Sequence, residues 1–180
     1  MRHFLILLLF VLPANAFAND WDALRQPGAI AIMRHAIAPG TGDPADFRLG
    51  DCSTQRNLDE RGREQARAIG DAFRSRGIAF DRVLTSQWCR TRETANLLDL
   101  GPVADAPALN SFFRDRSTRD RQTEETRDLI AATPGSLMLV THQVNISALT
   151  GRFTRSGEVL VVRLEEDGGA EVLGSILIAP

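Results

Sequence analysis

Two short apolar segments of the chain each end in a histidine, and these histidines are the residues best suited to chemistry. Ala29 to Met33 is apolar and is followed at once by Arg34 and His35, and a second apolar run from Leu137 precedes His142. Short apolar runs bounded by glycine or proline predict buried strands. Ligands of open α/β sheets bind at the carboxyl ends of the strands, so we expect both histidines at one such edge.

A third strand end is expected to bring a second arginine to the same edge. The segment 80–86 predicts a strand that leads directly into a helix carrying Arg90. Arginine presents a planar fork of donors that matches phosphate oxygens and stays charged. A neutral histidine can attack phosphorus, and phosphoryl transfer otherwise needs positioning and charge neutralisation. The expected chemistry is therefore phosphoryl transfer at an anion site.

The remaining pattern alternates strands with helices at short spacing. This predicts a three-layer α/β/α domain with a mainly parallel central sheet and an antiparallel C-terminal hairpin. We expect further strands at 103–104, 137–141, 159–164 and 170–178, helices at 60–76 (capped by Asp59), 90–98, 124–132 and 145–149, a helical lead-in at 20–26, and loops at 39–51 and 110–123.

The N-terminus has the pattern of a secretory signal. Arg2 precedes an unbroken apolar run from Phe4 to Leu12, and small residues up to Ala18 suit a cleavage site. The run is too short to span a bilayer, which needs about 20 residues. We expect a signal peptide at 1–18 and one domain at 19–180, secreted or periplasmic and not inserted in a membrane, the alternative being a retained anchor.

The composition of the chain limits the classes of molecule that it is expected to bind. The whole chain of 180 residues has a net charge of −2 and is 43% hydrophobic. This balance gives no reason to expect a nucleic-acid partner. No Cys/His cluster has metal-ligand spacing, so we expect no metal and no cofactor. The oligomeric state cannot be read from the sequence.

The chain has two cysteines, Cys52 and Cys89. In an exported protein an even pair predicts a disulfide, and the alternative is two free buried thiols. Closing the loop between them would stabilise the fold by roughly 3–4 kcal/mol on the chain-entropy model.

Four segments resemble the histidine phosphatase (phosphoglycerate-mutase-like) superfamily, in the family's order. Met33-Arg34-His35-Ala36 is similar to its Arg-His-Gly motif, and the segment 58–66 to its Leu-Thr-x-x-Gly-x-x-Gln-Ala helix start. The segment 85–95 resembles its Ser-Ser-x-x-x-Arg-x-x-x-Thr-Ala motif, and Val140-Thr141-His142 its Val-Ser/Thr-His. The resemblance covers the chain from Ala29 to about Leu149.

The resemblance implies a role for each matching residue. His35 is the expected nucleophile that becomes phosphohistidine, and Arg34 and Arg90 are expected to bind the phosphoryl oxygens. His142 is expected to hydrogen-bond the phosphoryl group. Pocket-lining candidates for substrate binding are Arg56 and Asn57 before the helix and Gln143 after the second histidine.

The sequence departs from the family at two points. Ala36 replaces the usual glycine, which is tolerable if its φ is negative. The proton donor is also missing, because no Glu-Gly follows Arg90 in the 110–123 excursion and Gln143 stands where one branch has aspartate. Asp115 is the best substitute, with a solvated ion-pair residue as the alternative reading, and Glu124 is a fainter candidate.

These expectations combine into an exported, metal-independent phosphatase that forms a phosphohistidine on His35. The alternative is a non-catalytic relative that binds a phosphate or phospho-glycan. The expected partner is a small phosphorylated substrate or phospho-glycan whose identity the sequence does not give. Trp88, Phe112 and Phe113 could stack on a ring of the substrate or pack in the core.

Overall fold

The computed structural model describes residues 20–166 and 168–178. The expected signal peptide, residues 1–18, lies outside the described residues. The regular elements are β1 (Ile30–Arg34), α1 (Glu60–Arg74), β2 (Arg82–Thr85), α2 (Cys89–Leu98), β3 (Val103–Asp105), α3 (Arg119–Ala132), β4 (Leu137–Thr141), α4 (Gln143–Thr150), β5 (Val159–Leu164) and β6 (Ala170–Ile176). Short 3₁₀ helices lie at Trp21–Arg25, Cys52–Thr54, Pro107–Leu109 and Arg116–Thr118.

The strands form one sheet in the order β3-β2-β4-β1-β5-β6. The pairs β3/β2, β2/β4 and β4/β1 are parallel, whereas β1/β5 and β5/β6 are antiparallel. The expected mainly parallel sheet with an antiparallel C-terminal hairpin is confirmed. Because β1, β2 and β4 are parallel neighbours, their carboxyl ends lie side by side at one edge of the sheet.

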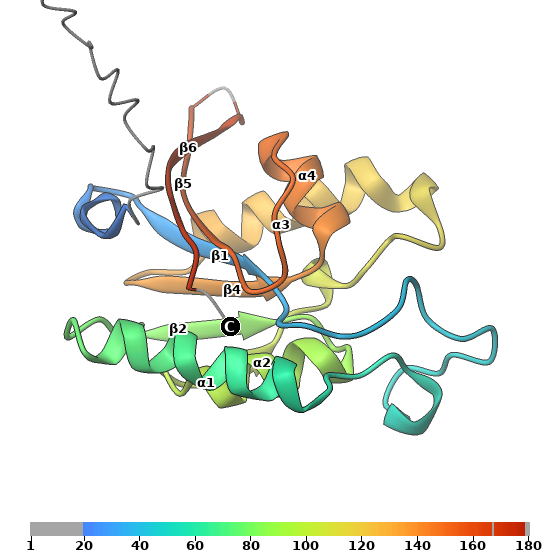
Figure 1. The fold of residues 1–180 in the computed structure, drawn as a ribbon. Helices are drawn as coiled ribbons and strands as arrows, with labels where there is room; N and C mark the ends of the chain where they lie inside the picture. The colour runs from blue at the N-terminus through green and yellow to red at the C-terminus, as the bar shows by residue number, and fades with distance from the viewer. Residues whose placement is uncertain (1–19, 167, 179–180) are drawn as a thin grey trace, which may run out of the picture.

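Helices cover both faces of this sheet, as Figure 1 shows. Successive residues of a strand point to opposite faces, so Ala31 and Met33 of β1 pack in one core and Ile30 and Ile32 in the other. The first core includes side chains from α1 and α2, and the second includes side chains from α3 and α4. Strands buried on both faces explain the continuous apolar runs in the sequence.

The N-terminus of α1 follows the sequence closely. The side chain of Asp59 accepts a hydrogen bond from the backbone N–H of Gly62 at 2.8 Å, so it caps the helix as expected. Gln65, one turn further on, donates to the carbonyl of Ser156 and accepts from the N–H of Ile37 at 3.0 Å. The helix start is thereby attached to the backbone that follows β1 and His35.

The expected loop at 110–123 is wrong in its second half. A 3₁₀ helix occupies Arg116–Thr118, and α3 begins at Arg119, five residues before the expected start at Glu124. The buried residues of α3 are Thr123, Thr126 and Ile130. Two of the three are threonines that satisfy their hydroxyls on backbone carbonyls, so the helix has a buried face without an apolar repeat.

In the described part of the chain, no helix is long and apolar enough to cross a membrane.

The close approach of α1 to the segment after His35 gives a prediction for Gly62. A Cβ at this position would stand 2.0 Å from the carbonyl oxygen of Ile37. Alanine favours a helix interior over glycine by up to about 1 kcal/mol, but overpacking costs about 1–3 kcal/mol. We expect Gly62→Ala to lower the free energy of unfolding in urea. Arg67→Ala, on the exposed side of α1, is the control and should stay within about 0.5 kcal/mol of the wild type. A Gly62→Ala protein as stable as the control would contradict the steric account.

Candidate active site

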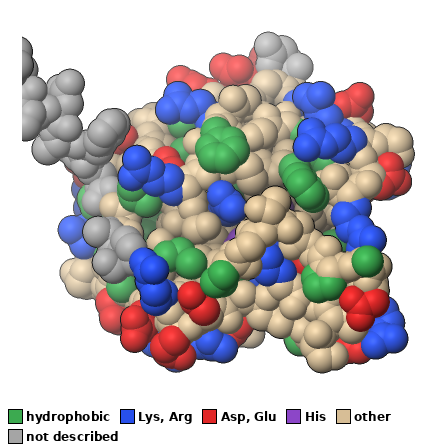
Figure 2. Space-filling model, turned by 45° about the vertical axis from the view of Figure 1, so that its right-hand side comes forward, with side chains coloured by type: hydrophobic (Ala, Val, Ile, Leu, Met, Phe, Trp, Pro, Cys, Tyr) green, Lys and Arg blue, Asp and Glu red, His purple; other side chains and the backbone are tan. Residues whose placement is uncertain are grey.

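A cavity of about 270 Å³ opens where β1, β2 and β4 end. Its lining combines three arginines, two histidines and one carboxylate with polar and aromatic side chains: Arg34, His35, Gly40, Thr41, Gly42, Asp43, Arg56, Arg90, Ser111, Phe113, His142, Gln143, Val144 and Phe153. His35 and His142 are only 2% and 3% exposed, and Figure 2 shows only slivers of histidine between the neighbouring side chains. The structure therefore brings the two predicted histidines into one recess.

His35 follows β1 and is held in one orientation by its own backbone. Its Nδ1 lies 2.7 Å from the carbonyl oxygen of Ala36. A carbonyl only accepts hydrogen bonds, so Nδ1 carries the proton and the neutral ring keeps its lone pair on Nε2. Nε2 accepts from Nε of Arg90 at 3.3 Å. The ring thus presents a nucleophilic nitrogen to an arginine.

His142 lies beside His35, with 5.6 Å between the ring centroids. Its Nε2 is 2.8 Å from the hydroxyl of Ser86, and its Nδ1 is 3.5 Å from Nη2 of Arg90. Because Arg90 can only donate, Nδ1 of the neutral ring is the acceptor and Nε2–H donates to Ser86. Ser86 of the 85–95 motif is therefore the residue that orients the second histidine.

Both imidazoles are held neutral. Burial, followed by the charge of Arg90, lowers the pKa of His35 and of His142 well below the ordinary value of 6.5. Neutrality suits His35 as a nucleophile, since a protonated ring has no lone pair. His142 would have to take up a proton at Nδ1 before it could donate to an anion there, and a bound dianion would favour that uptake.

The surrounding arginines make the cavity electropositive. Arg34 donates to the carbonyl of Thr154 at 3.4 Å, while its Nε is buried and has no hydrogen-bond partner among the described residues. Burial, together with Arg90, lowers the pKa of Arg34, and burial and the charges of Arg90 and Arg34 lower the pKa of Arg56 to about 10. These guanidinium groups remain charged at neutral pH, and an added anion would relieve their repulsion.

Arg90 carries an ion pair that the sequence analysis did not foresee. Its Nη1 and Nη2 donate to the two carboxylate oxygens of Asp43 at 2.6 and 3.1 Å. Both side chains are buried, at 3% and 6% exposed. Asp43 lies in the expected long loop after His35, and that loop contains three aspartates. Composition alone could not tell which of them returns to the cavity, although the flanking glycines Gly40 and Gly42 were a signal for a tight turn.

The other residues of the 85–95 motif have structural tasks at the site. Thr94 accepts a hydrogen bond from the N–H of Ala36 at 3.1 Å, so α2 fixes the backbone directly after His35. Among the described residues, the one non-glycine with positive φ is Asp99. Ala36 therefore has negative φ, and its methyl group in place of the family's glycine causes no backbone strain.

The side-chain amides of two predicted binding residues, Asn57 and Gln143, form hydrogen bonds with neighbouring protein groups. Asn57 does not line the cavity, and its amide donates to the carbonyls of Cys52 and Gln55. Gln143 lines the cavity, but its amide is engaged with Ser147 and Thr154. Arg56 does line the cavity, where its Nε donates to the carbonyl of Gly42.

Asp115 is also placed away from the cavity, which corrects its assignment as proton donor. Its exposed carboxylate accepts hydrogen bonds from the N–H and hydroxyl of Ser117, and these bonds lower its pKa. It caps the 3₁₀ helix that follows it. A position within the excursion loop was not a sufficient criterion, because the loop turns this aspartate outward.

The aromatic candidates divide into packing and rim residues. Trp88 and Phe112 are buried, and Trp88 stacks on Phe47 and touches the edge of His142. Phe113 and Phe153 are 44% and 78% exposed and line the mouth of the cavity. An adjoining recess shares both of them and includes Arg116 and Arg119.

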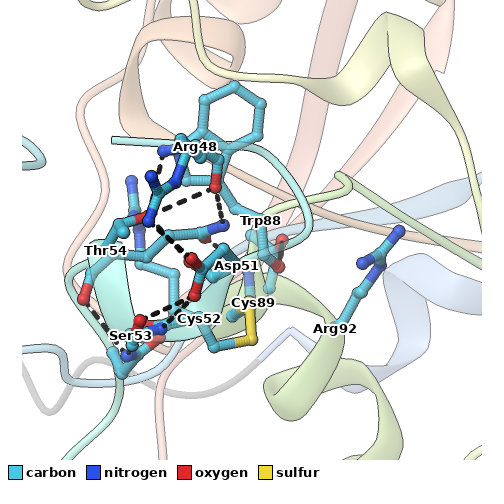
Figure 3. Close-up of a disulfide and its surroundings, with 12 residues drawn as sticks. Arg48, Asp51, Cys52, Ser53, Thr54, Trp88, Cys89 and Arg92 are labelled. Atoms are coloured by element: carbon cyan, nitrogen blue, oxygen red, sulfur yellow. Dashed lines mark hydrogen bonds and ion pairs between the residues drawn. A yellow bond between two sulfur atoms is a disulfide. The ribbon is translucent and has the colours of Figure 1, made fainter. Parts of the chain in front are cut away.

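Cys52 and Cys89 form a disulfide, as the sequence predicts. Cys89 is the residue immediately before Arg90 on α2, and Cys52 lies at the end of the loop that carries Asp43. Figure 3 shows the disulfide next to the turn that Asp51 caps, with Trp88 above Cys89 in this view. The disulfide therefore joins the two segments whose side chains form the Arg90–Asp43 ion pair.

No group of three or more histidine, cysteine, aspartate or glutamate side chains within the described ranges is arranged to hold a metal ion.

Comparison with known proteins agrees with this geometry. The model of the histidine phosphatase superfamily (branch 1) matches residues 30–112. Among solved structures, SixA from Agrobacterium tumefaciens superposes with a TM-score of 0.59 and 20% identity, covering 85% of this chain and 99% of that one. Phosphoglycerate mutase from Thermus thermophilus gives a TM-score of 0.59 at 15% identity, covering 84% and 99%. Residues 30–112 thus resemble the histidine phosphatase superfamily, and the chain shares the fold of these solved structures.

A curated relative shares only part of its length with this chain. The mitochondrial serine/threonine-protein phosphatase Pgam5 of Drosophila willistoni is 38% identical over 84 residues, which is 47% of this chain and 27% of that protein. The chain thus matches about a quarter of this larger phosphatase.

The two buried histidines predict acid sensitivity. Their folded-state pKa values lie below 6.5, so between these values and 6.5 the unfolded chain binds more protons than the folded one. Their contribution to stability is present above pH 6.5 and is lost as the pH falls, by up to about 1.4 kcal/mol per pH unit for each histidine. We expect urea unfolding between pH 7.5 and 5 to show this slope. His35→Gln should reduce it, and an unchanged slope in that variant would contradict the assignment.

The disulfide predicts a coupling between redox state and the cavity. Reduction should lower the free energy of unfolding by roughly 3–4 kcal/mol and also weaken the binding of inorganic phosphate, because the Arg90 segment loses its tie to the Asp43 loop. Cys52 is exposed, so mild reductant can reach it. Phosphate titration of oxidised and reduced folded protein checks this. Equal affinities would leave the disulfide with a purely stabilising role.

Proposed function

We propose that the protein is a phosphatase that hydrolyses a phosphomonoester through a phosphohistidine on Nε2 of His35, without a metal. The observation that carries this proposal is the orientation of His35. Its Nδ1–H is engaged by the carbonyl of Ala36, so the unshared pair on Nε2 faces Arg90 inside an arginine-lined cavity.

The roles of the surrounding residues follow from what each can donate. Arg34 and Arg90 offer guanidinium N–H groups to the phosphoryl oxygens and offset the charge that builds up in the transition state. His142 lies on the same side and donates from Nδ1 once protonated. Ser86 holds its other nitrogen, so the ring is already oriented when the phosphoryl group arrives.

The relatives support a phosphoryl reaction of this kind. SixA, a protein histidine phosphatase whose structure was solved with tungstate, shares the fold with a TM-score of 0.57 at 19% identity, covering 82% of this chain and 96% of that one. The Pgam5 match adds a phosphatase at higher identity over a shorter span. The substrate we propose is a small phosphorylated compound or phospho-glycan that enters past Phe113 and Phe153.

We also propose that the protein acts outside the cytoplasm, in the periplasm of a diderm bacterium. Its support is the signal-like sequence at 1–18 and the Cys52–Cys89 disulfide, since disulfides persist in oxidising compartments.

The decisive experiment is a burst assay of the oxidised protein with an aryl phosphate in EDTA. We expect release of one equivalent of phenol before steady turnover, together with acid-labile phosphate on the protein. His35→Ala should lose both, with turnover reduced by roughly 10³-fold or more.

Two arginines of α2 provide a matched control. Arg90→Ala should lower kcat/KM by roughly 10²-fold or more, because Arg90 faces His35. Arg92→Ala should leave it unchanged, because Arg92 pairs with Asp105 at the surface. Phosphate binding without turnover, retained in His35→Ala, would instead favour a non-catalytic phosphate-binding protein.

A further inference from the structure

The one carboxylate among the residues that line the cavity is Asp43. Each of its oxygens accepts two hydrogen bonds. Oδ1 accepts from Nη1 of Arg90 at 2.6 Å and from the backbone N–H of Arg56 at 3.2 Å. Oδ2 accepts from Nη2 of Arg90 at 3.1 Å and from the indole N–H of Trp88 at 3.0 Å. Four N–H groups therefore hold this carboxylate in place.

The guanidinium group that holds Asp43 is the same one that faces the nucleophile. Nε of Arg90 is 3.3 Å from Nε2 of His35, and Nη2 is 3.5 Å from Nδ1 of His142. A phosphoryl group on His35 would draw on Arg90, because phosphate oxygens match its donor fork. Asp43 and the phosphoryl group would thus both bind Arg90. Only the guanidinium group of Arg90 separates the carboxylate from Nε2 of His35.

We propose that Asp43 is the general acid that protonates the leaving group, and that phosphoryl binding to Arg90 releases it from its ion pair for this task. The proposal rests on the proposed phosphatase function and assigns the proton donor that the sequence analysis could not find. It gives the long loop after His35 a direct part in the reaction.

The surroundings of Asp43 favour such a change of protonation state. Burial raises its pKa, but hydrogen bonds from Arg90 and Trp88 and the charge of Arg90 outweigh it, so the pKa lies below the ordinary value in the free protein. When Arg90 turns its N–H groups to phosphoryl oxygens, the hydrogen bonds that lower the pKa of Asp43 weaken. The phosphoryl group also places a second negative charge close to the carboxylate. Both changes raise the pKa, because desolvation and like charge disfavour the carboxylate.

The other charged groups around Asp43 do not prevent this change. The side chain of Arg56 is turned to the carbonyls of Ala38 and Gly42, and its contact with Asp43 is made by the backbone N–H. Arg34 lies across the cavity on β1. His35 and His142 are neutral in the free protein. Arg90 is thus the cation whose side chain hydrogen-bonds the Asp43 carboxylate directly, and the charge of Arg56 acts on Asp43 only through space.

The backbone around Asp43 has the freedom to re-aim the side chain. Gly40 and Gly42 have φ of +89° and +71°, conformations that glycine adopts without strain. The loop is not paired with a strand. It is held by Arg56 on Gly42, by Arg114 on the carbonyls of Pro44 and Ala45, by the stacking of Phe47 on Trp88 and by the hydrogen bonds to Asp43 itself. A small shift of this segment can therefore move Asp43 from Arg90 toward the leaving oxygen.

The proton balance of the two half-reactions is complete with one carboxyl group. On binding, Asp43 takes a proton from solvent. Nε2 of His35 forms a bond to phosphorus as the P–O bond of the ester breaks, and the leaving oxygen takes the proton of Asp43. In the second step the carboxylate accepts a proton from water as its oxygen attacks phosphorus. The P–N bond breaks as the new P–O bond forms, which releases phosphate and the neutral ring, and Asp43 returns its proton to solvent when it pairs with Arg90 again.

The test measures how strongly the phosphorylation of His35 depends on the leaving group. A good leaving group such as 2,4-dinitrophenolate needs no proton, whereas an alkoxide does. We expect Asp43→Asn to lower the single-turnover rate with an alkyl phosphate by about 10²–10⁴-fold and with 2,4-dinitrophenyl phosphate by less than about tenfold. Asp43→Glu should restore part of the alkyl phosphate rate.

A control on the same loop separates the chemistry from the loop itself. Asp51 carries an exposed carboxylate that caps a turn and pairs with Arg48 outside the cavity. Asp51→Asn should keep wild-type rates with both substrates. The wild type supplies an independent measurement, because protonation by an acid makes its rate only weakly dependent on the pKa of the leaving alcohol.

Three results would overturn the assignment. An equal loss with both substrates would mean that Asp43 only positions Arg90. Tighter phosphate binding by Asp43→Asn with an unchanged leaving-group dependence would make Asp43 a competitor of the phosphoryl group. A selective loss in Asp115→Asn instead would return the acid to that residue. If the wild type forms no phosphohistidine on His35, the proposed function itself is refuted. This measurement is therefore made before any variant is tested.

Discussion

Three guanidinium groups share one recess, and their mutual repulsion is the constraint to which the surrounding structure responds. Arg34, Arg56 and Arg90 come from different segments, and their charges act on one another and on both histidines. The fold offsets this with carbonyl oxygens from Ala38, Gly42 and Thr154 and with the buried carboxylate of Asp43. The folded domain therefore has an electropositive site, suited to bind anions, at the edge where its parallel strands end.

The arrangement explains why so much of the fold is committed to holding a few atoms. Ser86 orients His142, Thr94 holds the backbone of Ala36, and Gln65 holds Ile37. Gln65 lies on α1, Thr94 lies on α2 and Ser86 directly follows β2, and all three elements also supply side chains to the core. The positions of the reacting groups therefore depend on the packing of α1 and α2 against β1 as much as on local contacts.

The elements and the two histidines could be predicted because their signals are local. Apolar runs, the Asp59 cap and the chain positions of Arg34, His35, Arg90 and His142 all follow from short stretches of sequence. Asp43 could not be predicted, because its partner Arg90 is 47 residues away and the loop that carries Asp43 has no periodic pattern. The start of α3 was missed for a related reason, since residues 119–123 contain no apolar side chain and their buried position is occupied by Thr123.

The misassigned polar residues illustrate the same limit. Asp115 and Asn57 have the right chemistry and lie near the right motifs, but each satisfies neighbouring backbone or serine groups. Short polar side chains readily bond to backbone groups a few residues away. Sequence identifies which residues could act, and the three-dimensional course of the loop decides which of them reach the cavity.

The hydrogen bond from His35 to a main-chain carbonyl also sets the lifetime of the proposed intermediate. A carbonyl dipole carries no net charge, so it stabilises a cationic phosphoimidazolium ring less than a carboxylate partner would. In the proposed mechanism, the phosphorylated ring is then a good leaving group when water attacks phosphorus. Under the proposed mechanism, this hydrogen bond favours rapid turnover of the covalent intermediate, and a phosphoryl relay that must wait for a second protein would need a different partner at Nδ1.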